Sequence, residues 1–164
     1  MNIVMLTPVA TPRQGVIAKE HGKTEKGYIY EPGDIITGKY VIDKRSYASD
    51  YTETANDGVN VTFVKTRQMA AVSTSDLIDH IDEFNARVSK KWIAESIKAK
   101  GIAHDGRTAF VNADGDLTLV ESEKVAVVPE DSLVLFNINE VGEYFNCYYC
   151  PKETVRKKYT GYEG

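Results

Sequence analysis

The stretch from Glu31 to Leu77 constrains the fold most, because a turn, three short apolar runs and a helix start follow one another within it. Pro32 fixes φ and Gly33 tolerates positive φ, so a tight turn that feeds a strand is predicted at 31–34. Apolar and polar residues alternate over 59–64, which is typical of a strand that buries one face. Short strands that follow one another in this way predict a β-rich fold.

Short β-prone runs occur on both sides of one longer helical pattern. Before that pattern, strands are expected at 15–18, 28–30, 35–42, 59–64 and 68–72, with the last two joined as a hairpin. After it, strands are expected at 102–104, 108–112, 117–120, 125–128 and 133–138. The polar segment 43–58 is expected to be a mobile loop. Each set of strands is large enough to close a small barrel.

One amphipathic helix is predicted between the two sets of strands. Apolar residues recur at spacings of three and four, and therefore share one helical face, at Leu77, Ile81, Phe84, Val88 and Trp92. Acidic residues precede basic ones along this segment, as the helix dipole favours. The helix is expected over about 75–99, and a break near Ser89 is left open.

The two sets of strands resemble each other weakly. Placing Thr62 over Thr118 aligns a strand, a polar tip and a second strand in both sets without a gap. Duplication gives such a pattern, and so do any two β-hairpins with alternating apolar residues. The expected fold class is α+β and β-rich, with two small β-barrels linked by the helix. The expected domains are an N-terminal barrel at 1–74, the linking helix at 75–100 and a C-terminal β domain with a basic aromatic tail at 101–164.

A net charge of -4 over 164 residues argues against a strongly basic, histone-like binder, because a polyanion would have to be held by a local basic patch. No apolar run approaches the roughly 18 residues that a membrane span needs. Residues 1–6 are apolar but lack the basic leader and the cleavage site of a secretory signal. With only two cysteines, the chain is expected to be cytoplasmic, with reduced thiols.

No catalytic signature occurs in the chain, since it has no Gly-rich phosphate loop, no nucleophile elbow and no His-Glu-x-x-His motif. Cys147 and Cys150 have the spacing that chelates zinc or forms a redox disulfide, but no second pair supplies further ligands. The three histidines are scattered. We therefore expect packing cysteines, no metal site, no cofactor and no enzymatic activity.

Basic residues stand beside aromatic residues at several places in the sequence. Lysine and arginine neutralise phosphates, while aromatic faces stack on bases or sugars. The expected phosphate contacts are Lys39, Tyr40, Lys44, Arg45, Lys90, Lys91, Arg156, Lys157 and Lys158, and the expected stacking residues are Tyr47 and Trp92. The alternative is that tyrosines fill the rims of small cores while lysines keep the surface soluble. Only a gathering of these residues on one face favours a binding function.

The region 28–77 resembles SH3-like barrels of the KOW and Tudor kind, on the motifs Gly33-Asp34-Ile35-Ile36 and Gly38-Lys39-Tyr40-Val41-Ile42 and on the strands that follow. In such barrels a Gly-Asp pair opens a strand, two hairpins follow, and a helical turn precedes the last strand. The chain is also similar in size to phage DNA-binding proteins of the MotB type, which are described as carrying a KOW-like domain. The resemblance implies SH3-like barrels in a non-enzymatic nucleic-acid-binding protein. Its expected partner is double-stranded DNA with little sequence preference, and its expected role is to modulate transcription or nucleoid organisation.

Two other classes of protein fit parts of the sequence. Residues 15–18, 33–36 and 69–77 occur in the order seen in GroES-like co-chaperonins, where a Gly-Asp strand and a closing segment bound a β-barrel. That class predicts a ring of several subunits. The remaining hypothesis is an interaction module that blocks a host protein by presenting the acidic segment 76–83 to a basic partner. No membrane partner and no small-molecule substrate is expected from the sequence.

Overall fold

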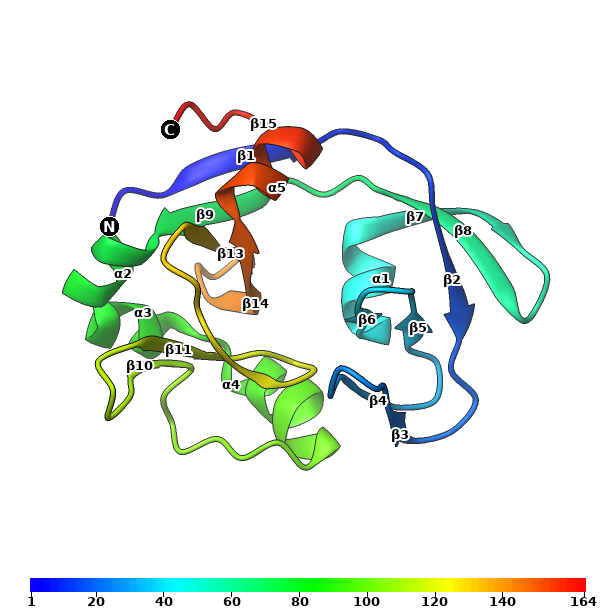
Figure 1. Ribbon diagram of the computed structural model, residues 1–164, viewed down its shortest axis with the longest axis horizontal. Coiled ribbons are helices and arrows are strands. Elements are labelled where there is room, and N and C mark those ends of the chain that lie inside the picture. The colour runs from blue at the N-terminus through cyan, green and yellow to red at the C-terminus, as the bar shows by residue number, and fades with distance from the viewer.

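Two groups of strands and helices face each other across the middle of the molecule, and we call them the smaller lobe and the larger lobe (Figure 1). The computed structural model describes all residues from 1 to 164. The fold is mixed α/β and strand-rich, with 38% of the residues in strands and 23% in helices. This confirms the β-rich character expected from the sequence. The chain crosses between the lobes twice, from β1 to β2 and from β8 to β9 (Figure 1).

The smaller lobe is built on an antiparallel five-stranded sheet with the strand order β6-β5-β2-β8-β7. Its strands are β2 (Arg13–Ile17), β5 (Ile35–Ile36), β6 (Val41–Ile42), β7 (Tyr51–Asn56) and β8 (Asn60–Lys65). Helix α1 (Lys44–Asp50) follows β6, and a separate hairpin joins β3 (Gly22–Lys23) to β4 (Ile29–Tyr30). Phe63 of β8 is fully buried in a small core with Ile35 and Ile42.

The larger lobe contains a five-stranded sheet with the order β14-β13-β9-β1-β15 and a three-stranded sheet with the order β10-β11-β12. The strands of the first are β1 (Val4–Pro8), β9 (Met69–Ser73), β13 (Ser132–Ile138), β14 (Tyr144–Pro151) and β15 (Tyr159–Thr160). Those of the second are β10 (Ala109–Val111), β11 (Leu117–Val120) and β12 (Val125–Val127). The helices of this lobe are α2 (Thr74–Asp79), α3 (Ile81–Arg87), α4 (Lys90–Trp92) and α5 (Lys152–Lys158).

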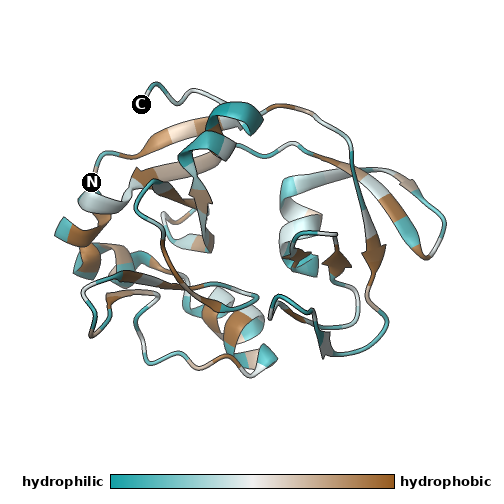
Figure 2. Cartoon of the chain, viewed as in Figure 1, coloured by the Kyte–Doolittle hydropathy of each residue, from teal (hydrophilic) through white to brown (hydrophobic).

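The central strands β9 and β13 are buried on both faces of the sheet, because each carries an uninterrupted apolar run. On one face, Val72 belongs to a cluster that includes Phe84 of α3 and Leu119 of β11. On the other face, Met69 belongs to a cluster that includes Val155 of α5. Helix α5 itself is mainly hydrophilic (Figure 2), so Val155 anchors an otherwise solvent-facing helix.

The structure divides the single helix predicted over 75–99 into shorter pieces. Helices α2, α3 and α4 are followed by a π-helical segment (Ile93–Ile97) and a 3₁₀ segment (Lys98–Lys100). The backbone is extended at Val88, which forms a β-bridge with Tyr144, and Ser89 then caps α4 by accepting a hydrogen bond from the Trp92 N–H. The tertiary pairing with β14 therefore interrupts the helix, although the predicted apolar face is buried.

Neither lobe forms a closed barrel, so the predicted pair of SH3-like barrels is not confirmed. In the smaller lobe, β6 and β7 are the two edges of the sheet and do not pair with each other. In the larger lobe, β13, β14 and β15 pair in one sheet with β1 and β9, which come from the other side of the predicted boundary at 74–75. The number of strands in a sequence does not determine their partners, because pairing is set by contacts between distant segments.

The segment 43–58, predicted to be a mobile loop, contains α1 and β7. Asp43 caps α1, because its side chain accepts a hydrogen bond from the Arg45 N–H at 3.1 Å. Strand β7 lies at an edge of its sheet and is mostly exposed, so it lacks the apolar alternation that identifies a strand from sequence.

The hairpin predicted from 59–64 and 68–72 is wrong in its pairing, although both segments are strands. β8 pairs with β2 and β7 in the smaller lobe, whereas β9 pairs with β1 and β13 in the larger lobe. Their proposed counterparts, β11 and β12, do pair with each other. The two halves of the internal repeat are therefore not equivalent units. Strand β14 was not predicted, and the expected strand at 102–104 does not form.

Candidate functional site

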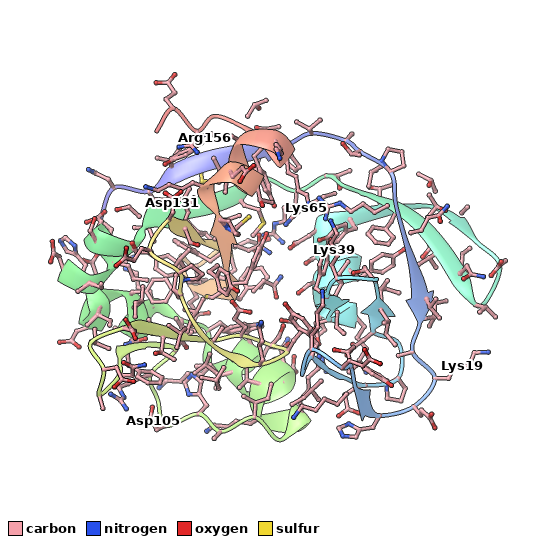
Figure 3. All side chains as sticks on the ribbon, in the orientation of Figure 1. Lys19, Lys39, Lys65, Asp105, Asp131 and Arg156 are labelled. Carbon is pink, nitrogen blue, oxygen red and sulfur yellow. The ribbon has the colours of Figure 1, made fainter.

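A cavity of about 500 Å³ lies between the two lobes, and residues of both lobes line it. The smaller lobe contributes residues of β2, β6, α1, β7 and β8, and the larger lobe contributes residues of β14, α5 and β15. The cavity is of the size of known ligand pockets, which occur preferentially where two units of structure meet. Figure 3 shows Lys39 and Lys65 in the space between the lobes. We treat this cavity as the candidate functional site.

Four cationic side chains from four separate segments line the cavity, and we call them the cationic cluster: Arg13 of β2, Lys39, Lys65 of β8 and Lys158 of α5. None of them forms an ion pair with a carboxylate. Burial lowers the pKa of Lys158, and repulsion from Arg13 and Lys39 lowers it further. Cations that repel one another without an acidic partner favour the binding of an anion.

Lys65 is the most buried member of the cationic cluster, with 4% of its surface exposed. Its Nζ donates hydrogen bonds to the hydroxyl of Tyr148 at 2.6 Å and to that of Tyr159 at 2.8 Å. It also lies 5.6 Å from the ring centre of Tyr51. Burial lowers the pKa of Lys65 to about 8, although attraction to Asp50 opposes that shift. At neutral pH the group is therefore mainly an ammonium ion, with two of its three N–H donors used.

Two glutamates of the segment between β11 and β12 also line the cavity. Glu121 is 5% exposed and accepts a hydrogen bond from the Tyr149 N–H at 3.0 Å. Burial, followed by repulsion from Glu123, raises the pKa of Glu121 to about 8. Burial also raises the pKa of Glu123 to about 7. Glu121 is therefore mainly protonated at neutral pH, and its side chain can donate as well as accept a hydrogen bond.

The other two acidic residues of the cavity are already engaged by groups of the protein. Asp43 lies 3.1 Å from the buried ammonium of Lys100, and Asp50 accepts a hydrogen bond from the Asn137 amide at 2.8 Å. These two carboxylates therefore do not neutralise the cationic cluster by direct pairing. With Glu121 protonated, the balance of charge inside the cavity is positive.

Asn146 of β14 lines the cavity in an unusual backbone conformation. It is the one non-glycine residue with positive φ, at 54°, and it sits where β14 carries an extra residue relative to β13. Such a bulge re-aims a side chain and is common beside functional sites. Asn146 is only 7% exposed, yet its Nδ2 has no hydrogen-bond partner. A buried amide without a partner is costly unless a ligand or water satisfies it.

The structure brings four of the residues predicted from sequence to this cavity: Lys39, Tyr40, Lys157 and Lys158. Tyr40 accepts a hydrogen bond from Arg13 at 2.8 Å, which holds the guanidinium of Arg13 in the cavity wall. Lys157 is paired with Glu153 at 3.1 Å on the exposed face of α5. Part of the predicted set of residues therefore lies together at one place, as a binding function requires.

The remaining predicted residues lie outside the cavity. Lys44 and Arg45 are exposed on α1, and Arg45 lies 3.7 Å from Glu95. Lys90 and Lys91 are exposed on α4, at the end of the molecule opposite α5 (Figure 1). Arg156 is exposed at the outer side of α5 (Figure 3). Its guanidinium lies over the ring of Tyr162.

Neither of the two predicted stacking residues is free to stack. Trp92 is 6% exposed and belongs to the core of the larger lobe. Tyr47 packs edge-on against Phe63, and its hydroxyl donates to Glu53 at 2.7 Å. Stacking on a base would therefore have to come from the tyrosines of the cavity instead.

Sequence reasoning missed Arg13, Lys65, Glu121 and Asn146. The sequence did contain a pattern that identifies Lys65. Alternate residues of a strand point to the same face, so Lys65 lies on the buried face that Val61 and Phe63 also occupy. No comparable signal identifies the others. Their positions depend on a turn, a bulge and the meeting of two lobes.

The two cysteines are free and buried, and they pack in different hydrophobic clusters. Burial raises the pKa of both thiols. The structure contains no group of three or more His, Cys, Asp or Glu side chains arranged to hold a metal ion. The burial of Cys147 and Cys150 in these clusters agrees with cysteines that serve packing.

No protein-family model, no curated protein and no solved structure matches this chain. No helix of the structure is both long enough and apolar enough to cross a membrane.

Proposed function

We propose that this protein binds nucleic acid without changing it chemically, and that the cationic cluster contacts the phosphates. The observation that carries the proposal is the convergence of Arg13, Lys39, Lys65 and Lys158 on one cavity without carboxylate partners. Lysine and arginine are the side chains that hold phosphate groups in proteins. Tyrosines lie beside these cations, and aromatic rings stack on bases with little sequence preference.

The charge of the whole molecule makes this local cluster important. The net charge is -4, so a polyanion would be attracted by the cluster and not by the overall field. We interpret the smaller lobe as an opened SH3-like unit of the KOW or Tudor kind. Its five short antiparallel strands form one sheet, and the edge strands β6 and β7 do not pair to close it. The proposal implies a cytoplasmic role in transcription or nucleoid organisation.

A gel-shift titration with a short duplex and with a single strand of mixed sequence tests the proposal. Affinity is expected to fall steeply between about 50 and 200 mM salt, because phosphate contacts release counterions. The double variant Lys39→Ala/Lys158→Ala should weaken binding. It should also reduce the slope of log affinity against log salt by about 1.4 for a single strand or about 1.8 for a duplex.

The double variant Lys90→Ala/Lys91→Ala is the matched control, because it removes the same charge from exposed positions on α4. It should retain most of the affinity. A loss confined to the α4 variant would move the contact surface away from the cavity, and no binding at low salt to either form of DNA would end the proposal.

A further inference from the structure

We propose that the cavity binds one nucleoside monophosphate unit, with its phosphate on the cationic cluster and its base among the tyrosines beside Asn146 and Glu121. This inference rests on the proposed function and names the ligand of the same site. The unit is either a free mononucleotide or one residue of a strand that has left its stack. Both sources carry the same phosphate, sugar and base.

The size of the cavity limits the ligand to a single unit. About 500 Å³ suits a small molecule, whereas a base pair held between two backbones would need a groove. A nucleotide that enters from a strand must first unstack, and the free-energy cost of unstacking is smallest for single strands. The geometry therefore favours a single strand, a strand end or a distorted duplex over an intact double helix.

The phosphate would meet donors that the protein leaves unused. Lys65 Nζ donates to two tyrosine hydroxyls and retains its third hydrogen. Arg13 uses one nitrogen on Tyr40 at 2.8 Å, and the rest of its guanidinium forms no hydrogen bond or ion pair within the protein. A phosphate offers several acceptor oxygens, and charge-assisted hydrogen bonds from such groups are the strong ones.

The base would meet a wall with both donors and acceptors. The Nδ2 of Asn146 is buried without a partner, and an asparagine amide can pair bidentately with the edge of adenine. Glu121 approaches from the neighbouring segment, where the Tyr149 N–H holds its Oε2 at 3.0 Å. Exocyclic amino groups and ring nitrogens of a base are complementary to such a set, while an aliphatic phosphate would leave it unpaired.

Equilibrium dialysis with the four deoxynucleoside monophosphates, the parent nucleosides and inorganic phosphate tests the inference. At least one mononucleotide should bind with a dissociation constant of about 1 mM or tighter. Its nucleoside and inorganic phosphate should each bind at least about tenfold more weakly, because each makes only part of the contacts.

Two variants test which residues bind the phosphate of the ligand and which bind its base. Lys65→Met should abolish binding of the mononucleotide and of phosphate. Asn146→Gly keeps the positive φ, which glycine adopts freely, and removes the side chain with its amide. This variant should weaken the binding of the mononucleotide by about tenfold and leave the binding of phosphate unchanged. Lys90→Met serves as the control for a charge change at a distance, and circular dichroism checks that each variant is folded.

The outcomes separate this inference from the proposed function. If strands bind and mononucleotides do not, the inference is wrong while the proposed function stands. If mononucleotides bind and strands do not, the ligand is the free nucleotide and the proposed function is wrong. Displacement of a bound single strand by the mononucleotide supports entry of one residue of the strand. Phosphate that binds as tightly as the mononucleotide would reduce the cavity to an anion site and overturn the inference.

Discussion

The Nζ of Lys65 lies 2.8 Å from the hydroxyl oxygen of Tyr159, although 94 positions separate the two residues in the chain. Lys65 ends β8 of the smaller lobe, while Tyr159 begins β15 of the larger lobe. The hydrogen bond therefore joins the lobes at the wall of the cavity. A buried ammonium whose hydrogen bonds go only to neutral hydroxyls is an expensive way to join two units, which points to a role in binding.

Lys65→Met is expected to stabilise the protein while it abolishes ligand binding. The substitution removes a buried ammonium whose pKa burial lowers from 10.5 to about 8, so its charge opposes folding at neutral pH by up to about 3 kcal/mol. Urea denaturation at neutral pH measures the change in the free energy of unfolding. Lys39→Met, at an exposed position, should change stability little. A large loss of stability in Lys65→Met would assign the lysine a structural role.

Stability should fall as the pH rises from about 4.5 to about 8, because of Glu121. Its ordinary pKa of 4.5 is raised to about 8 in the folded state, so in this range the folded chain binds a proton that the unfolded chain releases. Glu123, with a pKa of about 7, adds to the trend in the lower part of the range. Thermal unfolding measured across these pH values reports the effect.

Glu121→Gln is the matched variant for the pH dependence, because the amide has nearly the shape of the protonated acid. It should flatten the profile between pH 4.5 and 8 and be relatively more stable than the natural chain at the alkaline end. A profile that is unchanged by this substitution would show that Glu121 ionises normally in the fold.

Lys100→Met is expected to destabilise the protein by about 3–5 kcal/mol, because removing one partner of a buried ion pair leaves uncompensated charge. Lys100 Nζ lies 2.9 Å from Asp34 and 3.1 Å from Asp43, and all three side chains are buried. Adding Asp34→Asn and Asp43→Asn should restore part of the loss. Lys98→Met, two positions earlier and exposed, is the control. Urea denaturation of the set would contradict the prediction if Lys100→Met matched the control.

Trp92→Phe should leave the affinity for nucleic acid within about twofold, because the indole ring is buried in the core of the larger lobe and not at the cavity. The gel-shift titration that tests the proposed function also measures this variant. A tenfold loss of affinity, with stability unchanged, would restore Trp92 as a stacking residue.

Local patterns in the sequence predicted many elements and few of their partners. The alternation over 59–64 identified β8, and the apolar spacing of Leu77, Phe84 and Val88 identified a face that is buried. The polar edge strand β7 and helix α1 escaped prediction, because an exposed strand needs no apolar alternation and a short helix needs only its cap at Asp43.

Part of the cavity was also within reach of the sequence. Lys39, Tyr40, Lys157 and Lys158 were chosen because cations and aromatic residues adjoin there, and all four line the cavity. The same rule selected Trp92, but Trp92 is buried in the core, because burying a large apolar ring lowers the free energy of the folded state. The presence of a cation beside an aromatic residue in the sequence therefore does not show whether the aromatic residue lines a cavity or packs in the core.

The sequence by itself determined the β-rich character, the buried face of the helical segment and the mild negative charge, because these depend on local periodicity and composition. The tertiary structure alone decided that β8 and β9 part into different lobes and that Arg13, Lys65 and Lys158 meet. The reason is physical: strand pairing and the meeting of charges depend on contacts between segments that are distant in the chain, and no local pattern encodes which distant segments will pair.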